Sequence, residues 1–110
     1  MSEIKELYFL DNAYKEYMDL PDTIKQEFGF KLWQVQNGIE PANTKSMSGM
    51  KGIFELREWS NDSTYRAMYT TIIKGKIVVL HAFQKKSQKT PQKNLEIIRK
   101  RQKEALEEFK

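Results

Sequence analysis

Three cationic side chains in the second half of the chain have the types and spacing needed to bind a phosphate group. Arg57, Arg66 and Lys85 fall in or directly after three neighbouring segments that have the composition of strands. An arginine offers a planar pair of donors to phosphate oxygens, and a lysine offers a movable point charge. Such groups can also stabilise the charge that develops on phosphorus when the 2′-OH of RNA attacks the adjacent phosphate. That reaction does not require a metal ion.

The expected strand arrangement brings these cations together. The three strand-like segments are residues 51–59, 64–74 and 76–84, and short polar or glycine-containing breaks separate them. In an antiparallel meander, the end of one strand lies beside the start of the next, so Arg57 is expected near Arg66. Lys85 and Lys86, at the end of the last strand, are expected to reach the same edge of the sheet.

The two arginines also have a purely structural interpretation. Arg57 and Arg66 can pair with acidic residues of their own hairpin, which are Glu55, Glu58 and Asp62. Such cross-strand ion pairs are common on antiparallel sheets and need no ligand. The sequence leaves both interpretations open, because either one uses the same residues in the same register.

The neighbouring candidates have similar alternatives. His81 has a pKa that is easily tuned near neutral pH, but a histidine in an apolar strand is more often a buried, hydrogen-bonded residue than a catalyst. Lys85 and Lys86 can be lysines that keep a strand edge soluble. Trp33 falls within an expected helix and is interpreted as structural. No cluster of histidine and carboxylate residues indicates a metal site.

The charge distribution indicates a polyanionic partner that is met by one face of the protein. Residues 1–40 carry four lysines and eight acidic residues, whereas residues 85–103 carry eight basic residues and one acidic residue. Such asymmetry is typical of nucleic-acid binding, although a solvated basic helix gives the same pattern. The candidate contacts to nucleic acid, with Trp59 as a surface for base stacking, are Lys51, Trp59, Lys89, Lys93, Arg99 and Lys100.

The elements that must position these residues follow from hydrophobic periodicity. Besides the three strands, we expect a strand at 4–10, helices at 11–20, 22–38 and 91–109, and a loop at 39–50. The predicted fold is α+β in the order β-α-α-β-β-β-α, a small, mostly antiparallel sheet packed by helices. One face of the sheet is expected to pack on helices, and the other can face water.

Length and composition limit the class of protein. The chain has 110 residues, 39% of them hydrophobic, which predicts one folded domain over residues 1–110. It has no cysteine, so disulfides and thiolate metal ligands are excluded. No apolar run approaches the roughly 18 residues of a spanning helix, and the start lacks a signal-peptide pattern. A cytoplasmic protein without a membrane association is expected.

The second half of the chain contains four short motifs in a fixed order. Gly52 precedes "ELR" at Glu55-Leu56-Arg57, and "YR" stands at Tyr65-Arg66. "LHAFQKK" follows at residues 80–86 and "TP" at Thr90-Pro91. Together these motifs resemble the phage-derived Gp49-like/HigB family of toxins, within the RelE superfamily. The upstream runs "YKEYMDLPDTIKQ" and "KSMSGMKGIFELR" also fit, the second being similar to the family's usual "K-x-L-x-G" approach.

The resemblance implies a fold and an activity. Family members are toxins of type II toxin–antitoxin modules that cleave mRNA, typically on the ribosome. Their reaction needs no metal or other cofactor and yields a 2′,3′-cyclic phosphate. A cognate antitoxin, often a helix-turn-helix DNA-binding protein, neutralises them. By this resemblance Arg66 is the phosphate-stabilising arginine, Arg57 the arginine of "ELR", and Lys85 and Lys86 the basic pair.

The chain departs from the best-studied superfamily members at two places. They carry lysines near the "ELR" strand where this chain has Ile53 and Glu55, and they often use a C-terminal tyrosine or histidine, which is missing here after Lys86. Proton transfer is then assigned to other groups, with Glu55 or His81 as base and Lys85 or Lys86 as acid. The alternatives are a non-catalytic RNA- or ribosome-binding module on the same fold and a structural phage-associated protein.

Overall fold

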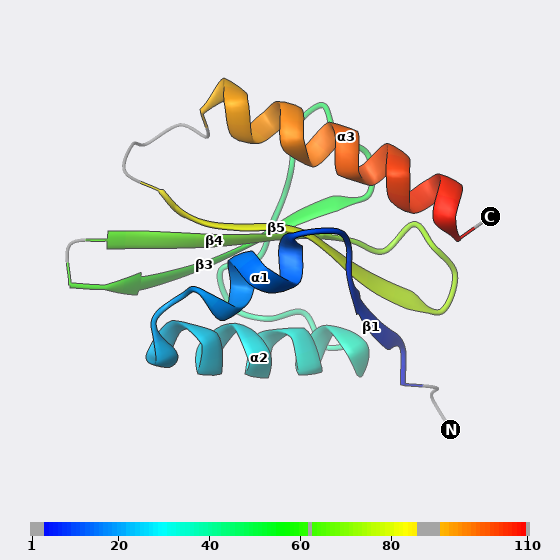
Figure 1. The fold of residues 1–110 in the computed structure, drawn as a ribbon. Helices are drawn as coiled ribbons and strands as arrows, with labels where there is room; N and C mark the ends of the chain where they lie inside the picture. The colour runs from blue at the N-terminus through cyan, green and yellow to red at the C-terminus, as the bar shows by residue number, and fades with distance from the viewer. Residues whose placement is uncertain (1–3, 62, 86–90, 110) are drawn as a thin grey trace.

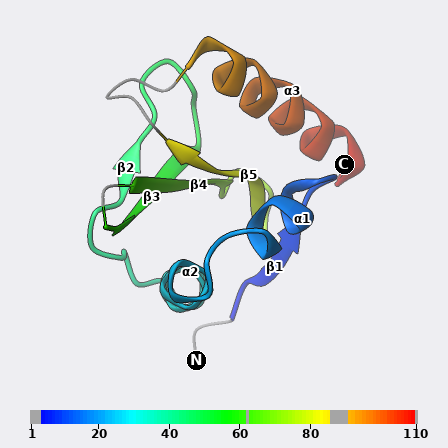
Figure 2. The same cartoon turned by 60° about the vertical axis from the view of Figure 1, so that its left-hand side comes forward.

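A five-stranded sheet packed by three helices forms the part of the chain that the structure describes, residues 4–61, 63–85 and 91–109 (Figures 1 and 2). The structure is a computed structural model. In chain order the elements are β1 (Glu6–Phe9), α1 (Ala13–Met18), α2 (Asp22–Gln36), β2 (Lys45–Ser46), β3 (Ile53–Ser60), β4 (Ser63–Thr70), β5 (Lys76–Lys85) and α3 (Gln92–Glu108). Apart from β2, this order is the predicted one.

The sheet is mostly antiparallel, as predicted. Its strand order is β1-β5-β4-β3-β2, and only the pairing of β1 with β5 is parallel among the described residues. The three long strands β3, β4 and β5 form the expected meander. β1 lies beside the first part of β5 only, from the partners Glu6 and Lys76 to the partners Phe9 and Val79. The predicted α+β fold is therefore confirmed.

Helices cover both faces of the sheet, so the expectation of one face open to water was wrong. In Figure 1, α3 lies above the sheet and α2 below it. Phe28 and Leu32 of α2 pack with Leu56 in one core, whereas Ile98 of α3 packs with Ile53 in the other. Alternate residues of β3 point to opposite faces, and both sets contain apolar side chains that need cover.

The apolar stripe of α2 is present as predicted. Ile24, Phe28, Leu32 and Val35 are all buried. Trp33, interpreted as structural, is 52% exposed and stacks on exposed Phe30 with ring centroids 5.9 Å apart. Trp33 lies off the stripe, so the core does not need it. None of the helices in the described ranges combines the length and the apolar character needed to cross a bilayer.

The segment predicted as a loop, residues 39–50, contains the short edge strand β2. Lys45 pairs with Glu55 and Ser46 pairs with Phe54. A strand of two polar residues has no hydrophobic periodicity, so it cannot be predicted from the local sequence. It forms because β3 offers an edge with which it can pair. The turn that follows ends at Gly52, whose φ is +77°. A Cβ atom at Gly52 would lie 2.0 Å from Cγ2 of Ile72, so glycine is required there.

A register shift in the β4–β5 ladder sets the orientation of the last strand. Met68 pairs with His81 while Tyr69 pairs with Val79, so Leu80 is an extra residue on β5. An extra residue of this kind is a β-bulge, which re-aims the side chains that follow it. Leu80 packs in the core under α3, and His81 also contacts α3. The bulge therefore places two consecutive side chains on the α3 side of the sheet.

Candidate anion-binding site

Arg57 and Arg66 lie directly opposite each other on β3 and β4 and share one carboxylate. Their positions are partners in the antiparallel ladder, and the alternation from Ile53 places them on the α3 side of the sheet. Oε1 of Glu55 accepts hydrogen bonds from Nε of Arg57 and from Nη1 of Arg66, each at 2.5 Å. The adjacency expected from topology is present, and so is the predicted pairing with an acidic residue.

Glu55 is a buried anion that the two arginines keep charged. Only 1% of its surface is exposed. Burial by itself would raise the pKa of Glu55, but the hydrogen bonds and charges of Arg66 and Arg57 outweigh burial and hold that pKa below its usual value. Glu55 is therefore ionised at neutral pH. Nε of Arg66 is buried and has no hydrogen-bond partner among the described residues.

Two lysines complete a cluster of four cations around Glu55. Lys85 pairs with Thr64 across the ladder and is 95% buried, since 5% of its surface is exposed. Burial, and next the charge of Arg66, lower the pKa of Lys85; Lys45 also contributes to this lowering. We call Lys45, Arg57, Arg66, Lys85 and Glu55 the cation cluster. Sequence reasoning missed Lys45, although it begins the motif "KSMSGM" that is similar to the family pattern.

The opposite side of the sheet anchors the backbone of this cluster. Nζ of Lys31, on α2, donates a hydrogen bond to the carbonyl of Arg57 at 2.9 Å. The same ammonium forms an ion pair with Glu58, and only 6% of the surface of Lys31 is exposed. Glu58 is thus paired away from the two arginines, contrary to one of the expected pairings. Lys31 therefore holds the part of β3 that carries Arg57. This contact joins residues that are 26 positions apart, so the local sequence does not predict it.

His81 is the centre of a second polar network, which is separate from the cation cluster's carboxylate. Nδ1 of His81 lies 2.8 Å from Oε1 of Glu16, and Nε2 lies 2.8 Å from Nδ2 of Asn94. Arg101 also donates to Oε1 of Glu16, at 2.8 Å. Burial alone would raise the pKa of Glu16, but the hydrogen bonds from His81 and Arg101 lower it overall. This geometry matches the interpretation of His81 as a satisfied strand histidine.

The network around His81 joins parts of the chain that sequence reasoning did not connect. Glu16 comes from α1, and Asn94 and Arg101 come from α3. Arg101 also donates to the carbonyl of Leu80 at 2.9 Å, which satisfies the backbone at the bulge. No motif predicts contacts over such separations. Their effect is to hold α1 and α3 on the strand that supplies Lys85.

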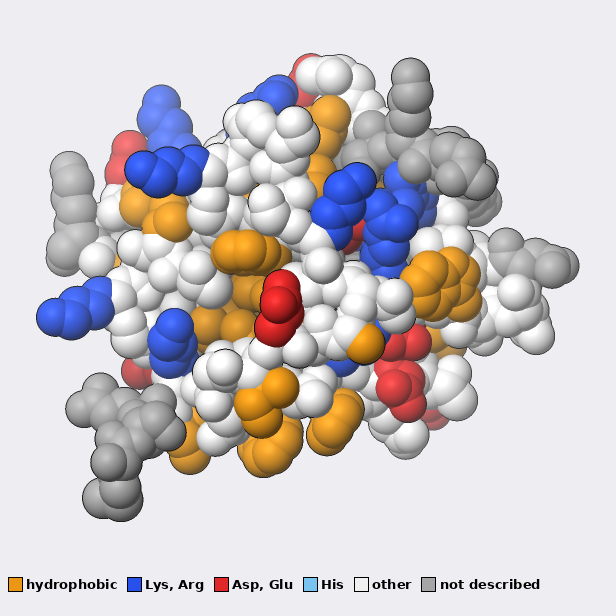
Figure 3. Space-filling model, turned by 180° about the vertical axis from the view of Figure 1, so that it is seen from behind, with side chains coloured by type: hydrophobic (Ala, Val, Ile, Leu, Met, Phe, Trp, Pro, Cys, Tyr) orange, Lys and Arg blue, Asp and Glu red, His pale blue; other side chains and the backbone are white. Residues whose placement is uncertain are grey.

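Aromatic side chains border the cation cluster on the same side of the sheet. Trp59 lies two residues after Arg57 on β3, so both point to one face, and 53% of its surface is exposed. Phe83, the ladder partner of Arg66, stacks on His81 with centroids 4.7 Å apart. Figure 3 shows Lys and Arg side chains gathered on one part of the surface, with hydrophobic side chains beside them. The arrangement can hold a phosphate and a base together.

The remaining basic candidates lie on α3 and in a turn. Lys93, Arg99 and Lys100 are exposed on α3, and Lys100 lies 3.9 Å from Glu104 in an exposed pair. Lys51 is exposed in the turn before β3, where its carbonyl accepts a hydrogen bond from Gln102. Lys86 and Lys89 fall outside the described residues. The roles of all these side chains stay predictions.

The described residues contain no group of three or more histidine, aspartate and glutamate side chains that could hold a metal ion. The polar groups gathered at the cation cluster are instead mostly donors, which suit an anion. An anion that enters meets three kinds of group, namely guanidinium, ammonium and the exposed indole of Trp59. Glu55 already occupies the centre as an internal anion.

Comparison with known families identifies the chain. The sequence pattern described as "Phage derived protein Gp49-like (DUF891)" matches residues 15–103. The chain belongs to this Gp49-like family. A comparison with curated proteins finds no match. The match covers the cation cluster and the His81 network, so both lie within the part that defines the family.

Solved structures of an Escherichia coli toxin share the fold. The isolated E. coli RelE toxin is 21% identical, with a TM-score of 0.61 over 87% of this chain and 97% of that one. The toxin-antitoxin complex RelBE of E. coli is 24% identical, with a TM-score of 0.61 over 76% of this chain and 99% of the other. At such identities the likeness establishes the fold, which is RelE-like.

Proposed function

We propose that this Gp49-like protein is the toxin of a type II toxin–antitoxin module and cleaves mRNA on the ribosome. The observation that carries the proposal is the cation cluster, in which four cations surround one buried carboxylate beside the exposed Trp59. Membership of the Gp49-like family and the RelE-like fold support it. The site would work in the cytoplasm with mRNA and the ribosome as partners, and an antitoxin would neutralise it.

The proposed chemistry is attack of a 2′-OH on the adjacent phosphate. The 2′ oxygen forms a bond to phosphorus, the bond to the 5′ oxygen breaks, and a 2′,3′-cyclic phosphate remains. Arg57 and Arg66 would stabilise the negative charge that develops on the phosphate oxygens. Lys85 would protonate the leaving oxygen, because an ammonium group with a lowered pKa is a stronger acid than an ordinary lysine. Lys86 would assist or replace it.

The identity of the base separates two versions of the proposal. Glu55 is close to the arginines, but their hydrogen bonds and charges lower its pKa, which makes it a weaker base. His81 is held between Glu16 and Asn94 and is 4% exposed. Because both candidate bases are engaged, a non-catalytic module that binds RNA or the ribosome is the second candidate function.

The proposed partner that neutralises the toxin is a cognate antitoxin, with a helix-turn-helix protein as the expected type. RelE of E. coli, which shares the fold, is found in a complex with its antitoxin. A second RelE structure, that of a mutant, contains a peptide of that antitoxin, and its TM-score to this chain is 0.60 at 24% identity over 76% of this chain and 85% of that one. The basic side chains of α3 and Lys51 are proposed to contact ribosomal RNA.

Arg66→Met tests the proposed function, because methionine keeps an unbranched apolar side chain at this position and removes the guanidinium charge. Induction of the wild-type protein in bacteria should arrest growth and produce mRNA ends that carry cyclic phosphates. Arg66→Met should relieve the arrest, while Lys74→Met, which changes an exposed lysine outside the cluster, should not. Equal toxicity of Arg66→Met at equal expression would rule out this role for Arg66. RNA binding without new ends would favour the second candidate.

A further inference from the structure

The second half of β5 has an edge that no described strand covers. β1 pairs with β5 only as far as Val79, and the chain then turns away into α1. β5 continues to Lys85, and its other edge pairs with β4 along that whole stretch. An unpaired strand edge presents a row of donors and acceptors that another chain can join. The part of this edge that has no described strand beside it begins after Val79.

Side chains satisfy the first polar groups of the edge, and the next ones have no hydrogen-bond partner among the residues that the structure describes. Arg101 donates to the carbonyl of Leu80, and the N–H of Ala82 donates to Oε1 of Glu16 at 3.2 Å. Alternate residues of a strand direct their N–H and C=O groups to the same side. The N–H of Gln84 therefore points to the same edge as that of Ala82, away from β4. Within residues 82–84, the free edge therefore comprises the carbonyl of Ala82 and the N–H and carbonyl of Gln84.

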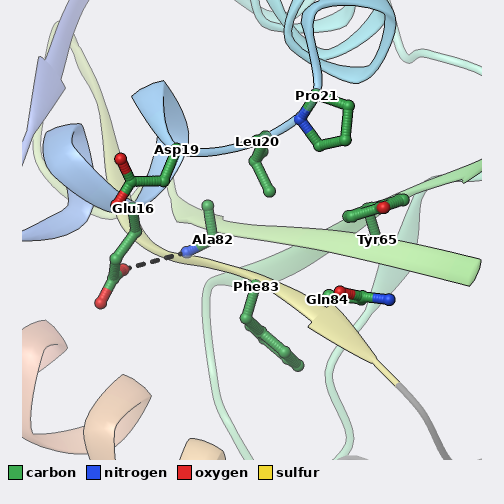
Figure 4. A pocket seen from close by; sticks show the side chains of 8 residues that line it. All are labelled: Glu16, Asp19, Leu20, Pro21, Tyr65, Ala82, Phe83 and Gln84. Atoms are coloured by element: carbon green, nitrogen blue, oxygen red, sulfur yellow. Dashed lines mark hydrogen bonds between the residues drawn. The ribbon is translucent and has the colours of Figure 1, made fainter.

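A hollow of about 410 Å³ lies along this free edge. Figure 4 shows it between the turn from α1 to α2, with Asp19, Leu20 and Pro21, and the strands β4 and β5. Tyr65 of β4 also lines the hollow. The hollow borders the open backbone groups, so it has room for the side chains of a chain that pairs there.

We propose that an extended segment of the cognate antitoxin adds to the sheet as a strand along residues 82–84 of β5. This inference rests on the proposed function for the existence of the antitoxin. Only an extended peptide repeats donors and acceptors at the spacing that a strand edge requires, so the backbone groups select this class of partner. The polar groups of a nucleic acid do not match that spacing.

The side chains on the two faces of β5 determine which residue types of the antitoxin segment fit there. Lys85 points to the cation cluster, so the segment's side chains on that face meet an excess of positive charge. Side chains on the other face meet Leu20, Tyr65 and the exposed carboxylate of Asp19. The segment therefore alternates acidic residues with apolar or basic ones.

This placement also gives the bound segment a means of inhibition. An acidic side chain beside Lys85 would compete with the phosphate of RNA for the cation cluster. The competition needs no movement of β3 or β4, because the added strand runs next to the lysine that the cluster already contains. Binding at the edge and neutralisation of the site are then one event.

Gln84→Pro tests the edge directly, with Gln84→Ala as the matched control. Proline removes the outward N–H of residue 84 and places a ring on the free edge, while the hydrogen bonds to β4 come from the alternate residues. Alanine removes the side chain, including its hydrogen bond to Ser63, but keeps the N–H. The probe is the purified product of the gene adjacent to the toxin gene. Its affinity should fall at least about tenfold with Gln84→Pro and less than about threefold with Gln84→Ala.

Hydrogen exchange of the full-length protein provides the second measurement. The amide of Gln84 should become protected when the antitoxin binds and should stay unprotected when the toxin alone is concentrated. Protection that is confined to other segments, or equal affinity of the proline and alanine variants, would overturn the proposal. Protection by self-association alone would assign the edge to a second copy and also overturn it. Growth arrest by the toxin alone tests the nuclease separately, so the two proposals fail in distinguishable ways.

Discussion

The substitution Glu55→Gln removes the internal anion of the cation cluster while keeping the shape of the side chain. Arg57 and Arg66 then lose the charge that they share, and the cluster of Lys45, Arg57, Arg66 and Lys85 has no carboxylate at its centre. Like charges that are partly buried and lack a counter-ion destabilise the folded state. We expect the variant to fold with reduced stability.

The expected loss in the free energy of unfolding is about 3 kcal/mol. Removing one partner of a buried ion pair costs about 3–5 kcal/mol. The lower end of this range applies because the side chain of Arg57 is 31% exposed, so water screens its charge. The side chain of Arg66 is only 6% exposed. With a slope of about 1–3 kcal/mol per molar urea, the unfolding midpoint should fall by about 1–3 M.

The contribution of Glu55 to the free energy of unfolding should depend on pH in a defined direction. The pKa of Glu55 in the folded protein lies below the ordinary value of 4.5, so the folded state favours the charged form. Its contribution is fully present above pH 4.5 and is lost as the pH falls through the lowered pKa. The difference in stability between wild type and Glu55→Gln should therefore be constant near neutral pH and shrink in acid.

Urea unfolding followed by circular dichroism at pH 7 and at acidic pH measures this prediction. Glu27→Gln is the matched control, because Glu27 is exposed on α2 and its substitution should change stability by less than about 0.5 kcal/mol. Sulfate should stabilise Glu55→Gln more than wild type, because an added anion can bind at the arginines that have lost their counter-ion. Identical midpoints for Glu55→Gln and wild type at pH 7 would refute the reasoning.

Two further comparisons test the packing of the scaffold by urea unfolding. Phe28→Ala should destabilise the protein by about 3–5 kcal/mol, because Phe28 is fully buried. Phe30, two residues further along α2, is 56% exposed, so Phe30→Ala should cost less than about 1 kcal/mol. Gly52→Ala should cost more than about 2 kcal/mol, since its Cβ would meet Ile72 at a φ of +77°, while Gly49→Ala, with a similar φ and open space, should cost about 1 kcal/mol. Equal losses of unfolding free energy for the two phenylalanine variants, or for the two glycine variants, would contradict the packing described for that pair.

The sequence predicted the meander and its cations because both depend on local information. Short breaks between strand-like segments indicate hairpins, and a hairpin places Arg57 beside Arg66 without any knowledge of the rest of the fold. The buried stripe of α2 likewise follows from period 3.6 alone. Glu55 was identified as a partner of the arginines, but its almost complete burial was not, because burial depends on how the neighbouring elements pack around it.

The features that the sequence did not predict depend on contacts between distant segments. β2 exists only because β3 offers an edge to Lys45 and Ser46. Glu16 meets His81 across 65 residues, and nothing in either neighbourhood indicates the other. The exposure of Trp33 was also not predicted; the period-matched stripe of α2 fills the core, and Trp33 lies off that stripe.

The pairing of β1 with β5 has a consequence for how the chain is made. Glu6 meets Lys76, so the first strand must wait for 70 further residues to be synthesised before its partner exists. Arg57, Arg66 and Glu55, by contrast, belong to one hairpin that closes over a few residues. The carboxylate is therefore synthesised just before the two guanidinium groups that it neutralises. The nascent chain never holds the paired arginines without their counter-ion, even while β1 and α3 are still unplaced.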